Sequence, residues 1–286
     1  MPTRKLYYED AHQSAFRAVV TACRQSDKGY EITLDATCFY PEGGGQAADT
    51  GTLDSVHVLH TREDGAEIVH LCDAPLAVGQ TVSGQIDWAS RFLRMQLHSG
   101  EHIVSGILHR RYGVNNTGFH MGAARTVIDF DGVIPSEALP GIEQEANRAV
   151  WQNIPLHIWY PSPEELPAVP YRSKKALPWP VRIVEIPGFD TCACCGTHVA
   201  SAGQVGLVKL LSVQKFREGV RVELLCGGRA LSYLDRVLGQ NRRISNLLSA
   251  KPFETAGGVE RLLGENQDLK TRLARMEEAR FAQLAD

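Results

Sequence analysis

A long segment without proline and a distant cluster of cysteines constrain this chain most. No proline occurs from Asp87 to Tyr112, apolar residues recur there at near-helical spacing, and Gly113 follows as a C-terminal stop. This pattern predicts a helix of about 24 residues. His98 and His102 are four residues apart on it, so their imidazoles share one face about one turn apart. Two such imidazoles can bind one ion, although ordinary helix histidines show the same spacing.

The cysteine cluster lies in the segment DTCACCGTH, residues 190–198. Cys194 and His198 form a CxxxH pair in this turn-rich stretch, and thiolate and imidazole are ligands that zinc prefers. Together with the two helix histidines they predict one four-ligand zinc site. An alternative uses the knuckle spacing of Cys192 and Cys195, and the simplest interpretation leaves the thiols as small buried hydrophobic groups. Four protein ligands normally mark a structural zinc, whereas a hydrolytic zinc keeps one position open, and the sequence does not decide between them.

The composition is that of a globular protein. The chain has 286 residues, of which 43% are hydrophobic and 22% charged, enough for two domains with an appendage. No apolar run approaches the roughly 18 residues of a membrane helix, and the N-terminus lacks the apolar centre of a secretory signal. We therefore expect a cytoplasmic protein that does not bind a membrane.

A net charge of −3 excludes a surface that is basic all over, but not a local basic face for nucleic acid. Four arginines share the predicted long helix with a single acid, Glu101. They are candidate phosphate contacts: Arg91, Arg94, Arg110 and Arg111.

The spacing of apolar residues predicts a mixed α+β chain in three parts. Residues 14–88 show short alternating runs such as Tyr30, Ile32 and Leu34, typical of a small barrel or sandwich. Helices and strands then alternate, which indicates a second domain of α/β or α+β type. The last part is helical and reaches the end of the sequence without a stop signal, as expected for a short appendage or a chain that has been cut.

Three ordered motifs carry a resemblance that spans roughly residues 1–230. YPEGGGQAADTGTL, HSGEH and GFDTCACCGTHVA together resemble the free-standing alanyl-tRNA editing proteins, which are similar to the editing domain of alanyl-tRNA synthetase. The resemblance implies a small β-barrel with the glycine-rich motif (1–87), a zinc-containing two-layer α/β editing domain built around the long helix (88–235) and a helical tail (236–286). It implies that one Zn²⁺ is held by the family's four ligand positions, here His98, His102, Cys194 and His198.

The same resemblance implies an activity. It would be hydrolysis of tRNA(Ala) mischarged with serine or glycine, by a water that attacks the aminoacyl ester. Because no aminoacylation domain precedes the expected barrel, this activity would act in trans. An ester of this kind needs a positioned water more than a strong nucleophile, and the chain has no GxSxG elbow of a serine hydrolase.

The chain departs from the family's usual HTGQH and CGGTH motifs. Ser99 replaces a threonine implicated in recognising the serine hydroxyl, and Cys195 replaces a glycine. Glu101 replaces a glutamine and is either a general base or, as we favour here, a solvated helix charge. The glycine-rich motif lacks the Lys-Ser/Thr of a phosphate loop, and the resemblance places its Gly44, Gly45 and Gln46 near the substrate.

Two other functions stay open at this point. The full ligand count is compatible with a non-catalytic tRNA-binding module that has a structural zinc. The changes at Ser99 and Glu101 are compatible with editing of another small aminoacyl ester.

Overall fold

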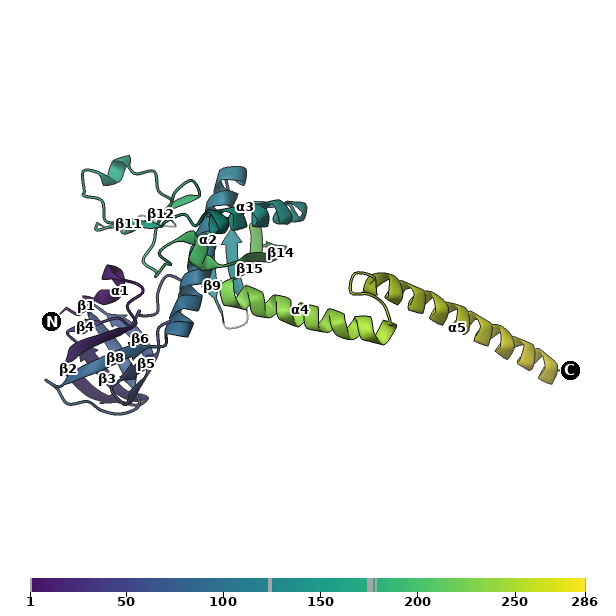
Figure 1. Ribbon diagram of the computed structural model, residues 1–286, viewed down its shortest axis with the longest axis horizontal. Coiled ribbons are helices and arrows are strands. Elements are labelled where there is room, and N and C mark those ends of the chain that lie inside the picture. Colours follow the sequence, from purple (N-terminus) through teal and green to yellow (C-terminus); the bar gives the residue numbers. More distant parts are fainter. Residues whose placement is uncertain (1, 123–124, 174–176, 178, 286) are drawn as a thin grey trace. The chain divides into compact units, whose positions relative to one another are not determined.

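The computed structural model describes residues 2–122, 125–173, 177 and 179–285 (Figure 1). Contacts divide the chain into two compact units, Met1–Ala230 and Leu231–Asp286. The structure contains both helices and β-sheets, so the predicted mixed α+β class is confirmed. The finer boundaries at residues 87 and 235 stay predictions.

Six antiparallel strands of the N-terminal part pair in a closed ring. In ring order they are β2 (Ala15–Ser26), β3 (Gly29–Leu34), β7 (Glu67–Cys72), β6 (Val56–Asp64), β5 (Gly51–Leu53) and β8 (Thr81–Ile86). In β8 exposed and buried residues alternate strictly, because successive side chains of a strand point to opposite faces. The inward side chains, among them Ile32, Leu34 and Leu53, form one apolar core. A short helix α1 (Leu6–Glu9) follows β1 (Arg4–Lys5), which pairs in parallel with β4 (Ala36–Thr37).

The long helix is confirmed as α2 (Trp88–Tyr112). Asp87 caps its N-terminus by accepting a hydrogen bond from the backbone N–H of Ser90, and Gly113 ends it in the left-handed conformation. The middle of the helix, from Leu97 to Leu108, is buried throughout. This part of the helix lies inside the domain, so His98 and His102 face protein rather than solvent.

The second half of the first unit packs around α2 (Figure 1). A four-stranded antiparallel sheet has the order β14 (Val208–Phe216), β15 (Gly219–Cys226), β10 (Thr126–Phe130) and β9 (Asn116–Met121). Helix α3 (Leu139–Gln152) contacts both α2 and β14. A smaller sheet has the order β11 (His157–Trp159), β12 (Ile183–Ile186) and β13 (Asp190–Ala193). The segment predicted to be turn-rich therefore begins with a strand, and β13 is also in contact with α2. Short 3-10 turns occupy Ser136–Ala138, Leu166–Ala168 and Ala202–Val205.

A buried ion pair joins the segment between β4 and β5 to α2. Arg91 has no exposed surface, pairs with Asp49, and also donates to the carbonyl oxygens of Cys38 and Ala11. The predicted contact of Arg91 with phosphates is therefore wrong, because this guanidinium is enclosed where α2 meets the ring of strands. The sequence shows that an arginine lies on a helix but not which face of the helix is covered.

The second unit consists of most of α4 (Gly227–Leu248) and of α5 (Thr255–Ala285). Asn241 joins the two helices by donating to the carbonyl oxygen of Pro252 and accepting from the hydroxyl of Thr255. The apolar side chains of α5 are largely exposed, for example Leu262 at 55% and Met276 at 69%. Among the described residues, no helix combines the length and the apolar character that a membrane crossing requires.

Candidate metal centre

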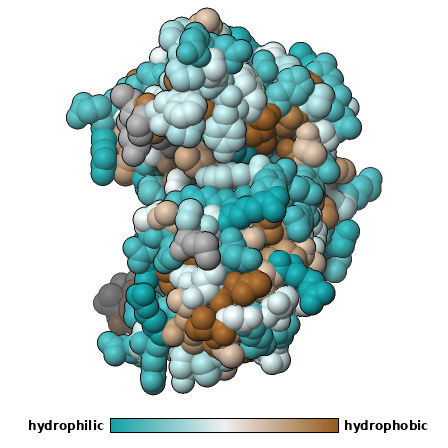
Figure 2. Space-filling model, turned by 90° about the vertical axis from the view of Figure 1, so that its left-hand side faces the viewer, coloured by the Kyte–Doolittle hydropathy of each residue, from teal (hydrophilic) through white to brown (hydrophobic). Residues whose placement is uncertain are grey.

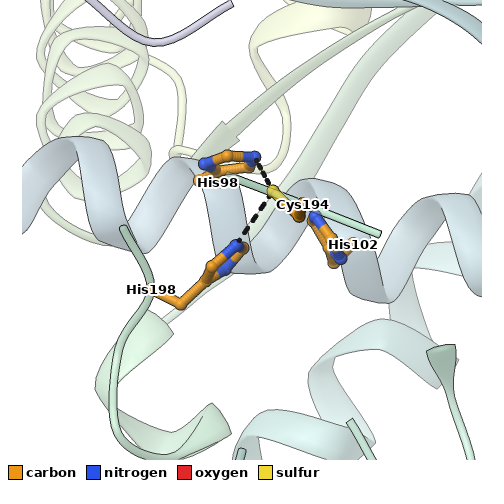
Figure 3. A group of neighbouring side chains, drawn as sticks. All are labelled: His98, His102, Cys194 and His198. Carbon is orange, nitrogen blue, oxygen red and sulfur yellow. Dashed lines mark hydrogen bonds between the residues drawn. The ribbon is translucent and has the colours of Figure 1, made fainter. Parts of the chain in front are cut away.

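Four side chains from two distant segments meet inside the first unit (Figure 3). His98 and His102 come from α2, and Cys194 and His198 come from the loop that follows β13. Their potential ligand atoms all lie within 4.8 Å of one another. The three histidines are at most 3% exposed, whereas Cys194 is half-buried. The structure thus brings together the four residues that the sequence predicts as ligands; their role as ligands stays a prediction.

The imidazoles direct one nitrogen toward the sulfur. Nε2 of His98 and Nε2 of His198 lie 3.3 Å and 3.4 Å from Sγ of Cys194 (Figure 3). The Nδ1 atoms face three different oxygens: Gln46 Oε1 at 3.3 Å from His98, Ser99 Oγ at 3.1 Å from His198, and Asp190 Oδ2 at 3.0 Å from His102. Asp190 is a close charged neighbour of Nδ1 of His102, without the alignment of a hydrogen bond. Where an oxygen accepts from an Nδ1–H, Nε2 is left free to bind a metal.

Neighbouring charges shift the pKa values of two members of the cluster, Cys194 and His102. Burial alone raises the pKa of the Cys194 thiol, but the nearby His98, His198 and His102 hold it well below its ordinary value. Burial alone lowers the pKa of His102, but Cys194 and Asp190 raise it well above its ordinary value. Thiolate is the form of cysteine that binds metals. The site therefore favours the thiolate even before an ion binds.

The three cysteines of the segment differ in their surroundings. Burial raises the pKa of Cys192 to about 11 and also raises the pKa of Cys195, which keeps both as thiols at neutral pH. Only Cys194 belongs to the group of four, while Cys195 is exposed. The geometry therefore favours Cys194 over the alternative Cys192–x–x–Cys195 knuckle.

The donor set fits a tetrahedral zinc. Three imidazole nitrogens and one thiolate converge, and their opposite nitrogens are backed by oxygen atoms. Imidazole nitrogen and thiolate sulfur are ligands that zinc binds, usually four of them in a tetrahedral arrangement. The protein's own contribution is to hold the donors from one rigid helix and one loop.

Gly196 is required where the loop crosses α2. A Cβ atom at this position would lie 2.0 Å from Cε1 of His98, so any larger residue would displace the imidazole. The backbone N–H of Gly196 also donates to Sγ of Cys194 at 3.4 Å. The glycine thus lets the loop approach His98 and helps to stabilise the thiolate.

The glycine-rich segment reaches the same site through Gln46. Backbone hydrogen bonds in both directions between Gly43 and Gln46 close a tight turn. Gly45 has a φ of +84°, and a Cβ there would lie 2.4 Å from the carbonyl oxygen of Phe119. Gln46 is 1% exposed and bonds to Thr197 as well as His98. The segment therefore packs at the site, while substrate contacts of Gly44, Gly45 and Gln46 stay predictions.

Glu101 and Ser99 are more enclosed than the sequence indicates. Glu101 is 4% exposed and accepts hydrogen bonds from Ser105 and Asn116, so its interpretation as a solvated helix charge is wrong. Its other carboxylate oxygen, Oε2, lies 3.8 Å from Nε2 of His102. Ser99 is fully buried, and its Oγ accepts from the backbone N–H of Val199 besides facing His198. The role predicted for Ser99 in reading the serine hydroxyl stays a prediction.

The remaining predicted phosphate contacts differ in exposure. The side chain of Arg94 is 19% exposed and lies 3.4 Å from Asp49. Arg110 and Arg111 are 47% and 43% exposed, and both pair with Glu145. On the face drawn in Figure 2, the hydrophobic residues that the structure describes lie in separate areas among hydrophilic ones.

Two residues of the site escape the sequence reasoning. Asp190 starts the cysteine motif and is a natural candidate to support a ligand, so its place in the motif is a usable signal. Arg172 binds both carboxylate oxygens of Asp190 from a segment without any recognisable motif. Its part in the site follows only from the tertiary structure.

Comparison with known proteins agrees with this architecture. Residues 181–222 match the threonyl and alanyl tRNA synthetase second additional domain, and residues 3–90 match the class II (A) tRNA synthetases. The chain is therefore similar, in these two regions, to domains of the aminoacyl-tRNA synthetases.

Individual proteins that are similar over most of the chain make the relationship more specific. The alanyl-tRNA editing protein Aarsd1 of Mus musculus is 29% identical over 90% of this chain and 67% of its own length. Aarsd1-A of Xenopus laevis is 33% identical over 82% of this chain and 58% of its own. AlaX-L of Pyrococcus horikoshii is 31% identical over 82% of this chain and 60% of its own. This chain is thus a relative of the alanyl-tRNA editing proteins, which confirms the resemblance, and it spans about three fifths to two thirds of their length.

Proposed function

We propose that this chain is a trans-editing hydrolase that removes serine, and also glycine, from mischarged tRNA(Ala). The single observation that carries the proposal is the convergence of His98, His102, Cys194 and His198, with Gln46 of the glycine-rich segment, in a relative of editing proteins. The ring of N-terminal strands would be the family's small barrel, and α2 the centre of its editing domain.

Zinc, bound by these four residues, would supply a positive charge that polarises the ester or the attacking water. The chain's own residues hold the geometry. Gln46 and Ser99 contact Nδ1 of His98 and of His198, Asp190 lies 3.0 Å from Nδ1 of His102, and all three imidazoles are buried. Only the sulfur side of the cluster is half-open, so the ester would approach past Cys194 and the exposed Cys195.

Selection of serine over alanine requires polar groups that pair with the serine hydroxyl, because alanine then leaves them unpaired. Ser99 is the residue that the motif points to. Since its hydroxyl is enclosed between Val199 and His198, we propose that it contributes by orienting His198.

Deacylation assays test the proposal. Purified full chain is incubated with seryl-, glycyl-, threonyl- and alanyl-tRNA(Ala), with and without a chelator and with zinc added back. We expect rapid loss of serine, slower loss of glycine, sparing of alanine, and inhibition by the chelator that zinc reverses. Preferred hydrolysis of the threonyl ester would instead indicate editing of another small aminoacyl ester.

The full ligand count favours a second candidate, a non-catalytic tRNA-binding module with a structural zinc. That module would bind alanyl-, seryl- and uncharged tRNA(Ala) equally and would turn over none of the esters. Gel-shift titrations of the zinc-loaded chain with each form of the tRNA distinguish the two functions.

A further inference from the structure

A second group of potential metal ligands shares His102 with the first. It consists of His102, Asp190 and Cys192, whose ligand atoms also lie within 4.8 Å of one another. The side chain of Asp190 is 1% exposed, and its Oδ2 lies 3.0 Å from Nδ1 of His102. Taken alone, this arrangement resembles a second cation site built on the far nitrogen of the same imidazole.

Arg172 already occupies the place of that cation. Its Nε and Nη2 donate to the two carboxylate oxygens of Asp190 at 2.7 Å and 2.8 Å. This bidentate arrangement engages both oxygens, and a divalent ion beside the guanidinium would meet strong repulsion in a buried site. The positive charge needed by a buried carboxylate is thus supplied by the chain itself.

The backbone fixes this guanidinium. The N–H of Arg172 donates to the carbonyl oxygen of Thr191, and its carbonyl oxygen accepts from the N–H of Ala193. Arg172 therefore lies beside β13 like one residue of an added strand, opposite Cys192. The clamp on Asp190 and the start of the ligand loop are held by the same short stretch of backbone.

We propose that Arg172 replaces a second cation, so that Asp190 becomes a positioning residue of the first metal site rather than a ligand of another. The pair aims the carboxylate at Nδ1 of His102 and keeps the second group closed to metal. His102 is the one histidine of the four ligands that a carboxylate supports; an amide supports His98 and a hydroxyl supports His198. This proposal rests on the proposed metal site but not on the substrate.

Metal titration of the full chain tests it without any activity measurement. Co²⁺ is added to the metal-free protein, and the cobalt–thiolate absorption gives the stoichiometry and, in competition with a chelator, the affinity. We expect one ion for each wild-type chain. Asp190→Asn should still bind one ion but 10- to 100-fold more weakly, as is typical when a partner of a ligating histidine is changed. Arg172→Lys, which keeps the charge but loses the two parallel bonds, should show a smaller loss.

The chain offers a matched control. Asp129 accepts the same bidentate contact from Arg221, at 2.6 Å and 2.8 Å, on the four-stranded sheet away from the site. Asp129→Asn should leave cobalt affinity unchanged. Two ions bound to the wild type, or wild-type affinity in Asp190→Asn or Arg172→Lys, would overturn the proposal. A chain that binds metal as expected but hydrolyses no ester would overturn the proposed function alone.

Discussion

Two regions of this chain contain buried histidines whose ring nitrogens have different partners. His70 on β7 has no exposed surface, and both of its nitrogens have uncharged partners: the hydroxyl of Thr37 at 2.9 Å and the carbonyl oxygen of Ile32 at 3.0 Å. His98 on α2 and His198 in the ligand loop each have one nitrogen near an oxygen partner and the other near the sulfur of Cys194.

The comparison shows which feature marks a metal site. A buried histidine with two neutral partners is a satisfied core residue, and burial lowers the pKa of His70 to about 4. The three histidines of the ligand cluster are buried almost as fully, and there the Nε2 atoms of His98 and His198 lie near the sulfur of Cys194. Convergence of unused donor atoms, more than burial or spacing in the sequence, therefore distinguishes the two regions.

The largest effect is expected when two of the four converging side chains are removed. His98→Ala combined with Cys194→Ala should lower the rate of seryl-tRNA(Ala) deacylation by about 100-fold or more, because the site loses two of its four donors. Rates under single-turnover conditions and metal content per chain measure it.

Cys195→Ser is the control for this experiment, since Cys195 is exposed and outside the group of four. It should keep both the rate and the metal. Full activity of the double variant would remove the metal centre from the mechanism.

The buried environment of His70 predicts that the stability of the chain depends on pH. The pKa of His70 is about 4 when folded and near 6.5 when unfolded, so the unfolded chain binds the proton more readily. The stabilisation is complete above pH 6.5 and is lost as the pH falls toward 4, by about 3 kcal/mol. Urea unfolding of wild type and His70→Gln at pH 7, 5 and 4 should show that the variant lacks this part of the pH dependence.

His57 serves as the matched control, because it is an exposed histidine of the neighbouring strand β6. His57→Gln should follow the wild-type curve at every pH. Identical curves for His70→Gln and wild type would mean that His70 is not held neutral by burial.

Much of this architecture could be predicted from the sequence, because helix ends and short ligand motifs depend on residues that are close in sequence. The boundaries of α2 follow from Asp87 and Gly113, and the four converging residues follow from two short motifs. Exposure could not be predicted, because tertiary packing decides which face of a helix is covered. Arg91 and Glu101 both lie on buried faces of α2, and the predictions that place them in solvent are wrong for this reason.

An intermediate effect is expected at Ser99. Ser99→Ala removes the oxygen partner of His198 Nδ1 and of the Val199 N–H, which should weaken cobalt affinity about tenfold. Ser99→Thr keeps the hydroxyl and should keep the affinity. The ratio of seryl to alanyl deacylation is measured in parallel, and a fall in this ratio at unchanged metal affinity would restore the direct role in reading the serine hydroxyl.

The smallest effect is expected at Glu101. Glu101→Gln keeps an oxygen in place to accept from Ser105 and Asn116. The rate of deacylation should therefore stay within about tenfold of the wild type, with unchanged metal content. A loss of about 100-fold or more would instead assign Oε2, 3.8 Å from Nε2 of His102, the role of proton acceptor. Glu101→Ala should lower the melting temperature more than Glu101→Gln does, because it leaves Asn116 without its buried acceptor.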